Sequence, residues 1–443
     1  MLRRTERCST KYYKTKDGVE YMMKNTTHTL NIFYKMLSAN SIGVWKNVNT
    51  SSRVTTEYVP KFFCNTANFP GFEKHIFKVD PGISYHLTGY GILRNEAMIR
   101  FLGESAERYT FSCIYKILEK SIVQESYENL NKKENSLVVP LEYINIYESM
   151  NVESDTIISW VRMQSFVEEV EYVYVPAALV IMGWGLLKDE ETNRINAVST
   201  GTACHQTIEK ALFNATVEYL QLDSSNLWWQ CGFKGKHVSD NLVKEICNDM
   251  GVNKRFWEKF DIKVSDISFD KPINIYACEI YGKEQGLPQY AIGIQGGIDI
   301  YNSIYRGILE GLTILEYAYN YKFINEEGYN KVNREKTNDF YDLDKNVIYY
   351  AKYGKSKIRE KECCCWNQDK IKQEGELFQY VKNTYRYAGF LDITPYDVRG
   401  VGFYIGRVII PELIPLYLPS SIPQKHPRFQ EYEVINYDPH PMP

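Results

Sequence analysis

The sequence predicts an α+β fold, in which helices pack on mixed β-sheets. Segments typical of strands and of helices are interspersed along the 443 residues, without the strict alternation that a parallel sheet would require. Apolar residues make up 44% and charged residues 24% of the chain, which is the composition of a globular protein. No segment repeats at the period of a solenoid, so a repeat architecture is excluded.

Charge and hydropathy exclude several classes of protein. The net charge of −3 gives no basic field of the kind that nucleic-acid-binding proteins use, so we expect no nucleic-acid partner. The N-terminus lacks the apolar core of a signal peptide, and no apolar run approaches the length of a membrane span. The ten cysteines include Cys363, Cys364 and Cys365 but no CxxC pair, which indicates reduced thiols. We therefore expect a cytoplasmic protein, and we leave open its attachment to a membrane-associated complex.

Local patterns predict the elements in the first part of the chain. Residues 1–75 mix short apolar runs with Asn, Thr and Ser, and we predict strands and loops that form an N-terminal subdomain, followed by a larger domain over 76–443. The turn-rich tract 78–91 leads to a helix over 94–109, where Leu, Ile, Met and Phe recur at helical spacing. Residues 110–125 prolong this helix or begin a second one.

Later elements alternate between strands and helices. The longest apolar run, within 171–187, predicts a central strand. A small-residue loop over 199–204 leads into a long helix over 206–222 with one buried face. The polar stretch 325–372 predicts an insertion or a helical excursion. The remaining expected elements are strands at 157–166, 274–281, 289–294 and in the proline-rich tail 396–443, and helices at 240–250 and 302–319.

Paired side chains with oxygen atoms are the first candidates for chemistry. On the helix over 94–109, Glu104 and Glu107 lie three residues apart and share one face, and Arg108 follows. Two carboxylates on one ridge repel each other unless a cation lies between them, and a divalent metal is the usual solution. A solvated, salt-bridged helix face is the alternative, and the spacing does not decide between the two.

Two further groups could act together with the first. Glu218 and Gln221 are again three residues apart, close to Asp223, and Arg306 lies one helical turn before Glu310. The sequence contains no P-loop, dinucleotide-binding glycine motif, nucleophile elbow or zinc-ligand pattern. An enzyme without a phosphate-binding glycine loop can still hold ATP through carboxylate-bound Mg²⁺, with an arginine for the remaining charge. Each group alone is also explained as part of the structure.

The segments that carry these groups resemble motifs of the YcaO family. RNEAMIRFLGESAERY resembles the first ATP-binding motif of that family, SxxxExxER, and STGTACHQTIEKALFNATVEYLQLD resembles its second block. Residues 295–315 resemble its later helix, RVIIPELIPLYLPSSIPQKHPRF resembles its closing segment, and PHPMP at 439–443 matches the PxPxP ending of azoline-forming members. These blocks follow the family's order, and they imply the composite YcaO fold, with a YcaO catalytic domain over 76–443.

The resemblance implies an ATP-dependent cyclodehydratase that acts on a ribosomally made peptide. Such an enzyme closes a Cys, Ser or Thr side chain onto the preceding carbonyl; ATP phosphorylates the amide-derived oxygen, which leaves as phosphate, and a thiazoline or oxazoline remains. By the same resemblance, Mg²⁺ would be held by Glu104, Glu107, Glu218 and Gln221, and ATP by these four with Arg100, Arg108, Arg306 and Glu310. The last residues of azoline-forming members enter the active site. This assigns a catalytic role to Pro439, Pro441 and Pro443, and makes the α-carboxylate of Pro443 a candidate general base.

Two departures from the family pattern leave alternatives open. Arg100 stands where the pattern has Ser, and Gln221 stands where it has a second Glu, which leaves that metal site one negative charge short. A catalytically weak scaffold that binds a peptide is therefore one alternative. A YcaO enzyme that forms a thioamide or an amidine is another, and the PxPxP ending argues against it. The sequence names neither the precursor nor the number of rings, and it does not decide between Cys and Ser or Thr.

The length of the chain bears on its partners. Some azoline synthetases fuse an E1-like, precursor-binding domain ahead of the YcaO domain. That domain usually brings CxxC zinc ligands and a glycine loop, and neither is present. We therefore expect a separate catalytic subunit that uses an E1-like leader-binding partner in trans. We also expect a flavin dehydrogenase in the same complex, as in streptolysin-like clusters for toxin or bacteriocin biosynthesis, and we leave a homodimer open.

Overall fold

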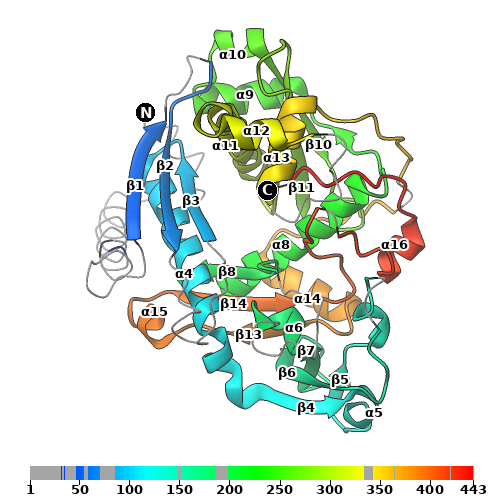
Figure 1. The fold of residues 1–443 in the computed structure, drawn as a ribbon. Helices are drawn as coiled ribbons and strands as arrows, with labels where there is room; N and C mark the ends of the chain where they lie inside the picture. The colour runs from blue at the N-terminus through cyan, green and yellow to red at the C-terminus, as the bar shows by residue number, and fades with distance from the viewer. Residues whose placement is uncertain are drawn as a thin grey trace.

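The protein is represented by a computed structural model, which describes residues 31, 34, 46–53, 58–69, 85–147, 151–184, 198–333, 343–363, 365–419 and 421–442. In this part of the chain, helices pack on three β-sheets, which confirms the predicted α+β class (Figure 1). Two long helices, α4 (Arg94–Leu118) and α8 (Ile208–Trp229), run through the middle of the molecule and contact these sheets. No helix among the described residues is long and apolar enough to span a membrane.

The first sheet is antiparallel, with the order β1–β2–β3 (Lys46–Arg53, Phe62–Phe69 and Tyr85–Gly91). Helix α4 packs on β2 and β3 and continues beyond its predicted end at Tyr109, because apolar residues continue on its buried face as Phe111, Ile114 and Leu118. The predicted boundary near residue 75 lies between β2 and β3, which pair in one sheet. The division into two domains stays a prediction.

The second sheet has the order β5–β7–β6–β13–β14–β8, and β4 pairs with β6. Its strands are β4 (Ile122–Ser126), β5 (Ser136–Val138), β6 (Ile157–Ser165), β7 (Tyr172–Pro176), β8 (Thr202–His205), β13 (Gly389–Asp392) and β14 (Tyr404–Ile409).

Two sequence predictions for the second sheet are wrong in their extent. The strand predicted over 171–187 ends at Pro176, and the short helix α6 (Ala177–Val180) follows. Proline has no N–H to donate to a sheet, so it suits the end of a strand. The loop predicted over 199–204 becomes strand from Thr202 onward, because β8 pairs with β14.

The third sheet is antiparallel, with the order β12–β11–β10–β9 (Tyr290–Gly297, Asn274–Gly282, Phe260–Asp266 and Lys236–His237). Helix α11 (Ile300–Ile324) packs on β12 and β11. A Cβ atom at Gly293 of β12 would lie 2.1 Å from the carbonyl oxygen of Gly307, so this close approach of strand and helix requires glycine. The same contact brings Glu310 of α11 to the backbone of β12.

The remaining helices lie around these sheets. The helix predicted at 240–250 is confirmed as α9, and the polar stretch 325–372 contains α12 and α13, which confirms the predicted helical excursion. The short segments η1 and η2 are 3₁₀ helices. The bounds are η1 (Glu119–Ser121), α5 (Tyr127–Leu130), η2 (Leu141–Tyr143), α9 (Asp240–Met250), α10 (Lys254–Lys259), α12 (Glu326–Lys331), α13 (Leu343–Tyr353), α14 (Glu374–Thr384), α15 (Tyr396–Gly400) and α16 (Pro427–Tyr432).

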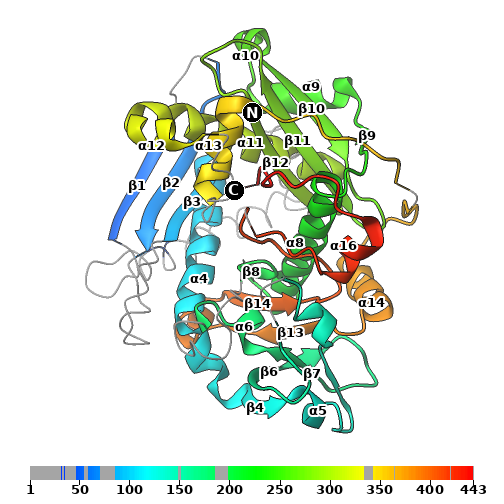
Figure 2. The same cartoon turned by 45° about the vertical axis from the view of Figure 1, so that its right-hand side comes forward.

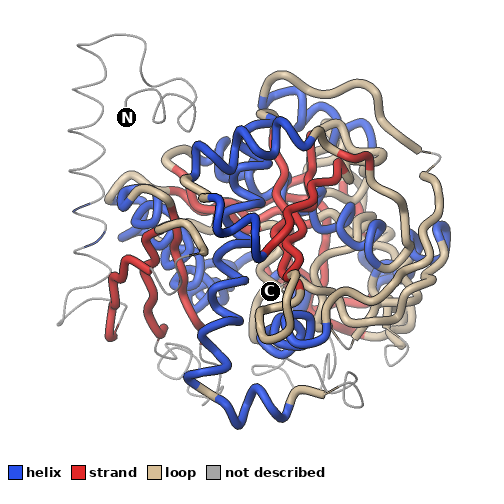
Figure 3. Tube along the Cα trace, turned by 90° about the horizontal axis from the view of Figure 1, so that it is seen from above, coloured by secondary structure: helices blue, strands red, loops and turns tan. Residues whose placement is uncertain are grey.

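Helix α8 connects the second and third sheets, because it contacts β14 and β8 of one and β12 and β11 of the other. Thr207 caps its first turn by accepting a hydrogen bond from the N–H of Lys210. The C-terminal end of the chain returns to this region: it lies near the middle of the molecule in Figure 2, and Figure 3 places it there in a view from above. The tail therefore lies beside the end of α8, the helix that carries two of the predicted site residues.

Candidate functional site

Three predicted residues of α4 lie between the first and second sheets. Glu104 Oε2 accepts a hydrogen bond from the backbone N–H of Thr88 in β3 at 3.1 Å. Glu107 Oε1 accepts one from the backbone N–H of Cys204 in β8 at 2.8 Å. Arg108 lies four residues after Glu104, and its Nη2 is 3.6 Å from Glu104 Oε1. The two carboxylates are thus held by two different sheets.

Glu218 of α8 lies near Glu107, although the two are far apart in the sequence. Its Oε2 accepts a hydrogen bond from the N–H of Gly201 at 3.1 Å. Burial, followed by the negative charge of Glu218, raises the pKa of Glu107 to about 8. Burial raises the pKa of Glu218 to about 7, and the hydrogen bond from Gly201 and the charges of Arg108 and Arg407 offset this only in part. The structure thus brings two carboxylates together, and the nearby arginines offset the effect of burial on their pKa values only in part.

The loop before β8 positions the N–H of Gly201, which donates a hydrogen bond to Glu218. Gly201 has a φ of +79°, in the left-handed region that favours glycine. A Cβ atom at this position would lie 2.2 Å from the carbonyl oxygen of Val408. Only glycine therefore lets the loop pass this close to β14 while its N–H faces Glu218.

Two more predicted residues converge on β12 from different helices. Gln221 Oε1 of α8 accepts a hydrogen bond from the N–H of Gly296 at 2.9 Å. Glu310 Oε2 of α11 accepts hydrogen bonds from the N–H of Ile294 at 3.0 Å and from Gln295 Nε2 at 3.1 Å. Burial raises the pKa of Glu310 despite these hydrogen bonds. The predicted acidic and amide ligands therefore share one mode of support: each accepts an N–H from the backbone of a strand or its adjoining loop.

The predicted arginines Arg100 and Arg306 belong to a neighbouring group. Arg100 Nη2 donates to Glu96 Oε1 at 2.9 Å. Burial, followed by the positive charge of Arg100, lowers the pKa of Arg306, and the charges of Glu310 and Glu96 act in the opposite direction. Glu96 is not among the residues predicted from the sequence. Its signal is the four-residue alternation of acid and base on α4, formed by Glu96, Arg100, Glu104 and Arg108.

The donors fit a hard divalent cation. Glu104, Glu107 and Glu218 offer only oxygen atoms, and a bound cation would counteract the burial that raises the pKa values of the latter two. Among the described residues, no group of three or more His, Cys, Asp and Glu side chains is arranged to hold a metal ion by itself. Mg²⁺ usually takes one or two carboxylates and completes its shell with water and phosphate oxygens. The residues therefore fit a magnesium ion that arrives with a nucleotide.

Asp223, five residues after Glu218 on α8, belongs to a different cluster. Its side chain is 0% exposed, and its Oδ2 lies 2.7 Å from Nζ of Lys271 and 2.7 Å from Nη2 of Arg428. Arg428 also binds Asp270 at 3.0 Å. We call Asp223, Lys271, Asp270 and Arg428 the ion network. Because its two positive and two negative charges balance, it does not require an added cation.

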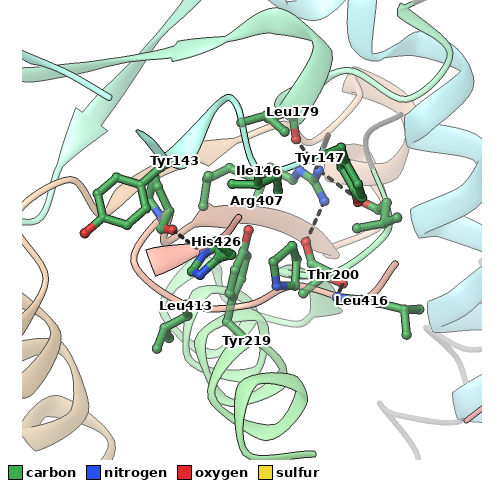
Figure 4. Close-up of a pocket in the computed structure, with 14 residues that line it drawn as sticks. Tyr143, Ile146, Tyr147, Leu179, Thr200, Tyr219, Arg407, Leu413, Leu416 and His426 are labelled. Atoms are coloured by element: carbon green, nitrogen blue, oxygen red, sulfur yellow. Dashed lines mark hydrogen bonds between the residues drawn. The ribbon is translucent and has the colours of Figure 1, made fainter. Parts of the chain in front are cut away.

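A small cavity lies beside Tyr219 of α8 and Arg407 of β14 (Figure 4). Its volume is about 50 Å³, which is room for a few water molecules and far too little for a nucleotide. Tyr219 and His426 line it, and Figure 4 shows Arg407 against its wall. Arg407 donates to carbonyl oxygens of the loop before β8, among them that of Thr200 at 2.9 Å. This buried cation therefore holds the loop that supports Glu218.

The predicted tail residues Pro439 and Pro441 are buried, together with His440 and Met442 between and after them. Pro443 lies outside the described residues. The nearest elements are α13 and the end of α8, whose side chains donate hydrogen bonds to tail carbonyls. The structure thus buries residues 439–442, and the entry of the last residues into the active site, which the family resemblance implies, stays a prediction.

Comparison with known proteins shows what the chain is similar to. Residues 88–414 match the YcaO family, described as a cyclodehydratase that binds ATP and Mg²⁺. A solved heterocyclase in complex with substrate and cofactor has a TM-score of 0.64 at 15% identity, and the match covers 93% of this chain and 55% of that one. The E. coli microcin synthetase McbBCD complex has a TM-score of 0.58 at 11% identity, covering 91% and 99%.

A third solved structure is the YcaO protein from Methanopyrus kandleri bound with AMPPCP and Mg²⁺. Its TM-score is 0.51 at 12% identity, and the match covers 88% of this chain and 91% of that one. At such identities the three structures share a fold with this chain, and the chain spans only about half of the length of the heterocyclase. A comparison with curated proteins gives no match.

Proposed function

The chain belongs to the YcaO family, and we propose that it is an ATP-dependent cyclodehydratase that converts Cys, Ser or Thr of a ribosomally made peptide into thiazoline or oxazoline. The observation that carries this proposal is the pair of Glu107 and Glu218, two carboxylates from separate helices whose pKa values stay raised although the charge of Arg108 acts on both. Burying unbalanced charge is costly, so folding alone gives no reason for such a pair. A bound magnesium nucleotide would supply the missing positive charge.

One set of residues around this pair would bind the metal ion, and another would bind the nucleotide. Glu104, Glu107 and Glu218 would hold Mg²⁺, with the amide oxygen of Gln221 one turn further along α8. Arg100, Arg108, Arg306 and Glu310 would line the nucleotide. Bound Mg-ATP supplies the phosphoryl group with which the amide oxygen of the peptide leaves as phosphate. The N–H groups of Cys204 and Gly201 keep Glu107 and Glu218 in fixed positions before any ligand binds.

Two protons must leave the peptide during the reaction. The thiol or hydroxyl loses one as its sulfur or oxygen bonds to the preceding carbonyl carbon, and the amide nitrogen loses the other as the C=N bond forms. ATP becomes ADP and phosphate, and the peptide loses the elements of one water molecule. We assign the first proton to the α-carboxylate of Pro443, whose ordinary pKa is about 3.5 and which needs an apolar setting to act as a base. Pro439 and Pro441 stiffen the segment that leads to it.

The proposed reaction needs partner proteins. We propose an E1-like, leader-binding protein that presents the peptide in trans, and a flavin dehydrogenase that oxidises the azoline. The structurally similar McbBCD microcin synthetase is itself a complex, which supports an assembly of this kind. We leave a homodimer open.

The proposal is tested by mass spectrometry of the peptide product. The protein, its candidate precursor peptide, the leader-binding partner and Mg-ATP are incubated together, and each ring formed should remove the mass of one water molecule. Omission of ATP should abolish the loss. Peptide mass that stays unchanged with well-folded partners would contradict the proposal, and replacement of oxygen by sulfur in the product would favour a thioamide instead.

A catalytically weak, peptide-binding scaffold is favoured by one observation. Arg100 is paired with Glu96, and the oxygen of Gln221 already accepts the N–H of Gly296, so two positions that depart from the family pattern have protein partners. Calorimetry with Mg²⁺ and AMPPCP distinguishes the enzyme from the scaffold. The enzyme should bind this nucleotide and the scaffold should not.

A further inference from the structure

The end of the chain is held by α13, a helix within the polar stretch that the sequence presents as an insertion. Asn346 is fully buried, and its Nδ2 donates to the carbonyl oxygens of His440 at 2.7 Å and Met442 at 2.6 Å. One helical turn later, Tyr350 Oη donates to the carbonyl oxygen of Pro439. Because Asn346 and Tyr350 are four residues apart, one face of α13 presents both to the tail.

The chemistry of these two side chains matches the chemistry of the tail. Pro439 and Pro441 have no N–H, so the segment offers carbonyl acceptors and few donors. Buried carbonyls need donors from elsewhere. Asn346 provides them in a fixed orientation, because its Oδ1 accepts the N–H of Val347 at 3.0 Å and its Nδ2 therefore faces the tail.

Groups outside α13 also hold the tail. His440 Nε2 lies 2.7 Å from the carbonyl oxygen of Tyr417, and burial lowers the pKa of His440 to about 4, so the ring is neutral at pH 7. Trp229 Nε1, at the end of α8, donates to the carbonyl oxygen of Asp438 at 3.3 Å. The tail is therefore fixed between α13, α8 and the segment around Tyr417.

Helix α13 also connects the tail to the predicted nucleotide site, because it packs on β12 and α11. The backbone N–H groups of strand β12 donate hydrogen bonds to Gln221 and Glu310. The element that holds the tail is thus attached to the strand that supports two predicted ligands of the magnesium nucleotide.

We propose that Asn346 and Tyr350 are positioning residues that fix the last residues of the chain for the cyclisation step. This inference rests on the proposed function. Neither side chain would touch ATP or the peptide; both act through the carbonyls of the tail. They should therefore affect the rate of ring formation and leave nucleotide binding unchanged.

The first test is a kinetic comparison of three variants. Asn346→Asp keeps the shape of the side chain, removes both donors and places a carboxylate oxygen against two carbonyls. We expect kcat for ring formation to fall about 10- to 100-fold, because small misplacements of reacting groups have effects of that size. The affinity for AMPPCP with Mg²⁺ and the KM for the peptide should stay within about twofold of the wild type. Tyr350→Phe should lower kcat less, by about fivefold.

Tyr353→Phe is the matched control. Tyr353 lies on the same helix, and its Oη donates to the carbonyl oxygen of Val332, outside the tail, at 3.4 Å. This variant should leave kcat unchanged. A chain extended by two glycines after Pro443 gives a second comparison, because Asn346→Asp should have little additional effect once the tail is displaced. Additive losses, or an equal loss in Tyr353→Phe, would overturn the proposal.

Hydrogen exchange tests the same contacts without any activity. Asn346→Asp and Tyr350→Phe should speed amide exchange in the peptide that covers residues 436–442, while Tyr353→Phe should not. Exchange that stays at the wild-type rate in both variants would overturn the proposal, and so would faster exchange combined with wild-type kcat. If the wild-type protein forms no ring at all, the proposed function fails, and the exchange measurement still decides whether Asn346 and Tyr350 hold the tail.

Discussion

Glu218 and Asp223 lie five residues apart on α8, and each belongs to a cluster of charged side chains; Glu218 is half-buried and Asp223 is fully buried. Near Glu218, backbone N–H groups support the carboxylates, and the pKa values of Glu107 and Glu218 rise to about 8 and about 7. Near Asp223, burial would raise the pKa of Asp270, but Lys271 and Arg428 overcome this and hold it at about 2. The first cluster is short of positive charge, and the second is balanced.

This difference separates two roles for buried charge on one helix. The ion network joins α8 to α16, and through Arg428 it fixes the start of the C-terminal segment. A buried charge with compensating partners is tolerated, and removal of one partner is costly. Near Glu107 and Glu218, the charge of Arg108 offsets the effect of burial only in part, so we expect a ligand to supply the remaining positive charge. If this contrast holds, substitutions in the two clusters should differ in both the sign and the size of their effects.

Glu107→Gln should have the largest effect, a loss of ATP turnover of about 10³-fold, or about 4 kcal/mol in activation free energy. The amide cannot supply the negative charge that Mg²⁺ requires. Steady-state ATPase assays with peptide and partner measure it, and circular dichroism checks the fold. Glu119→Gln is the control, because Glu119 lies just after the end of α4, is 53% exposed and pairs with the exposed Lys116. Normal turnover in Glu107→Gln would show that the metal assignment is wrong.

Asp223→Asn should lower the free energy of unfolding by about 3 kcal/mol. The substitution leaves Lys271 and Arg428 with Asp270 as their only remaining acidic partner in the ion network. Urea denaturation followed by fluorescence measures the loss. A change below about 1 kcal/mol would mean that the ion network contributes little to the free energy of unfolding. The contrast with Glu107 and Glu218 would then disappear.

Unlike Asp223→Asn, Glu107→Gln should stabilise the nucleotide-free protein, raising its free energy of unfolding by about 2 kcal/mol at pH 8. The folded pKa of Glu107, about 8, lies above its ordinary value, so its protonated form is favoured in the folded state. The stability that this proton confers is complete below pH 4.5 and is lost as the pH rises through 8, so the gain from Gln should vanish near pH 4.5.

Urea denaturation of wild type and Glu107→Gln at the two pH values tests this sign. Mg²⁺ with AMPPCP should then stabilise the wild type and leave the variant unchanged, because only the wild type offers the carboxylate. A variant that is less stable than the wild type at both pH values would mean that Glu107 is structurally balanced, as Asp223 is.

The fold class and several elements followed from local patterns, because they depend on neighbours in the sequence. Helix α9 begins and ends where the apolar spacing places it, and the i,i+3 pairs on α4 and α8 gave Glu104, Glu107 and Glu218 as candidates. The strand over 171–187 was overextended, since a continuous apolar run does not distinguish a strand from a buried helix such as α6.

The parts that sequence reasoning missed depend on contacts between distant residues. Asp223 meets Arg428 across 205 positions, so its spacing from Glu218 grouped it with the wrong cluster. Asn346 meets the tail across 94 and 96 positions, and nothing in its local sequence distinguishes it from other polar residues of that stretch. Glu96 is different, because its alternation with Arg100 was visible in the sequence.

Glu362→Gln should have the smallest effect, a change in unfolding free energy within about 0.5 kcal/mol. Glu362 pairs with Lys234 at 3.4 Å, and the two side chains are 84% and 54% exposed. The substitution breaks an ion pair, as Asp223→Asn does, but water solvates both charges before and after the change. Urea denaturation at low salt and at about 0.5 M NaCl should show the small difference disappear with screening. A loss as large as that of Asp223→Asn would mean that burial does not set the energy of these pairs, and then the raised pKa of Glu107 would no longer indicate a missing ligand.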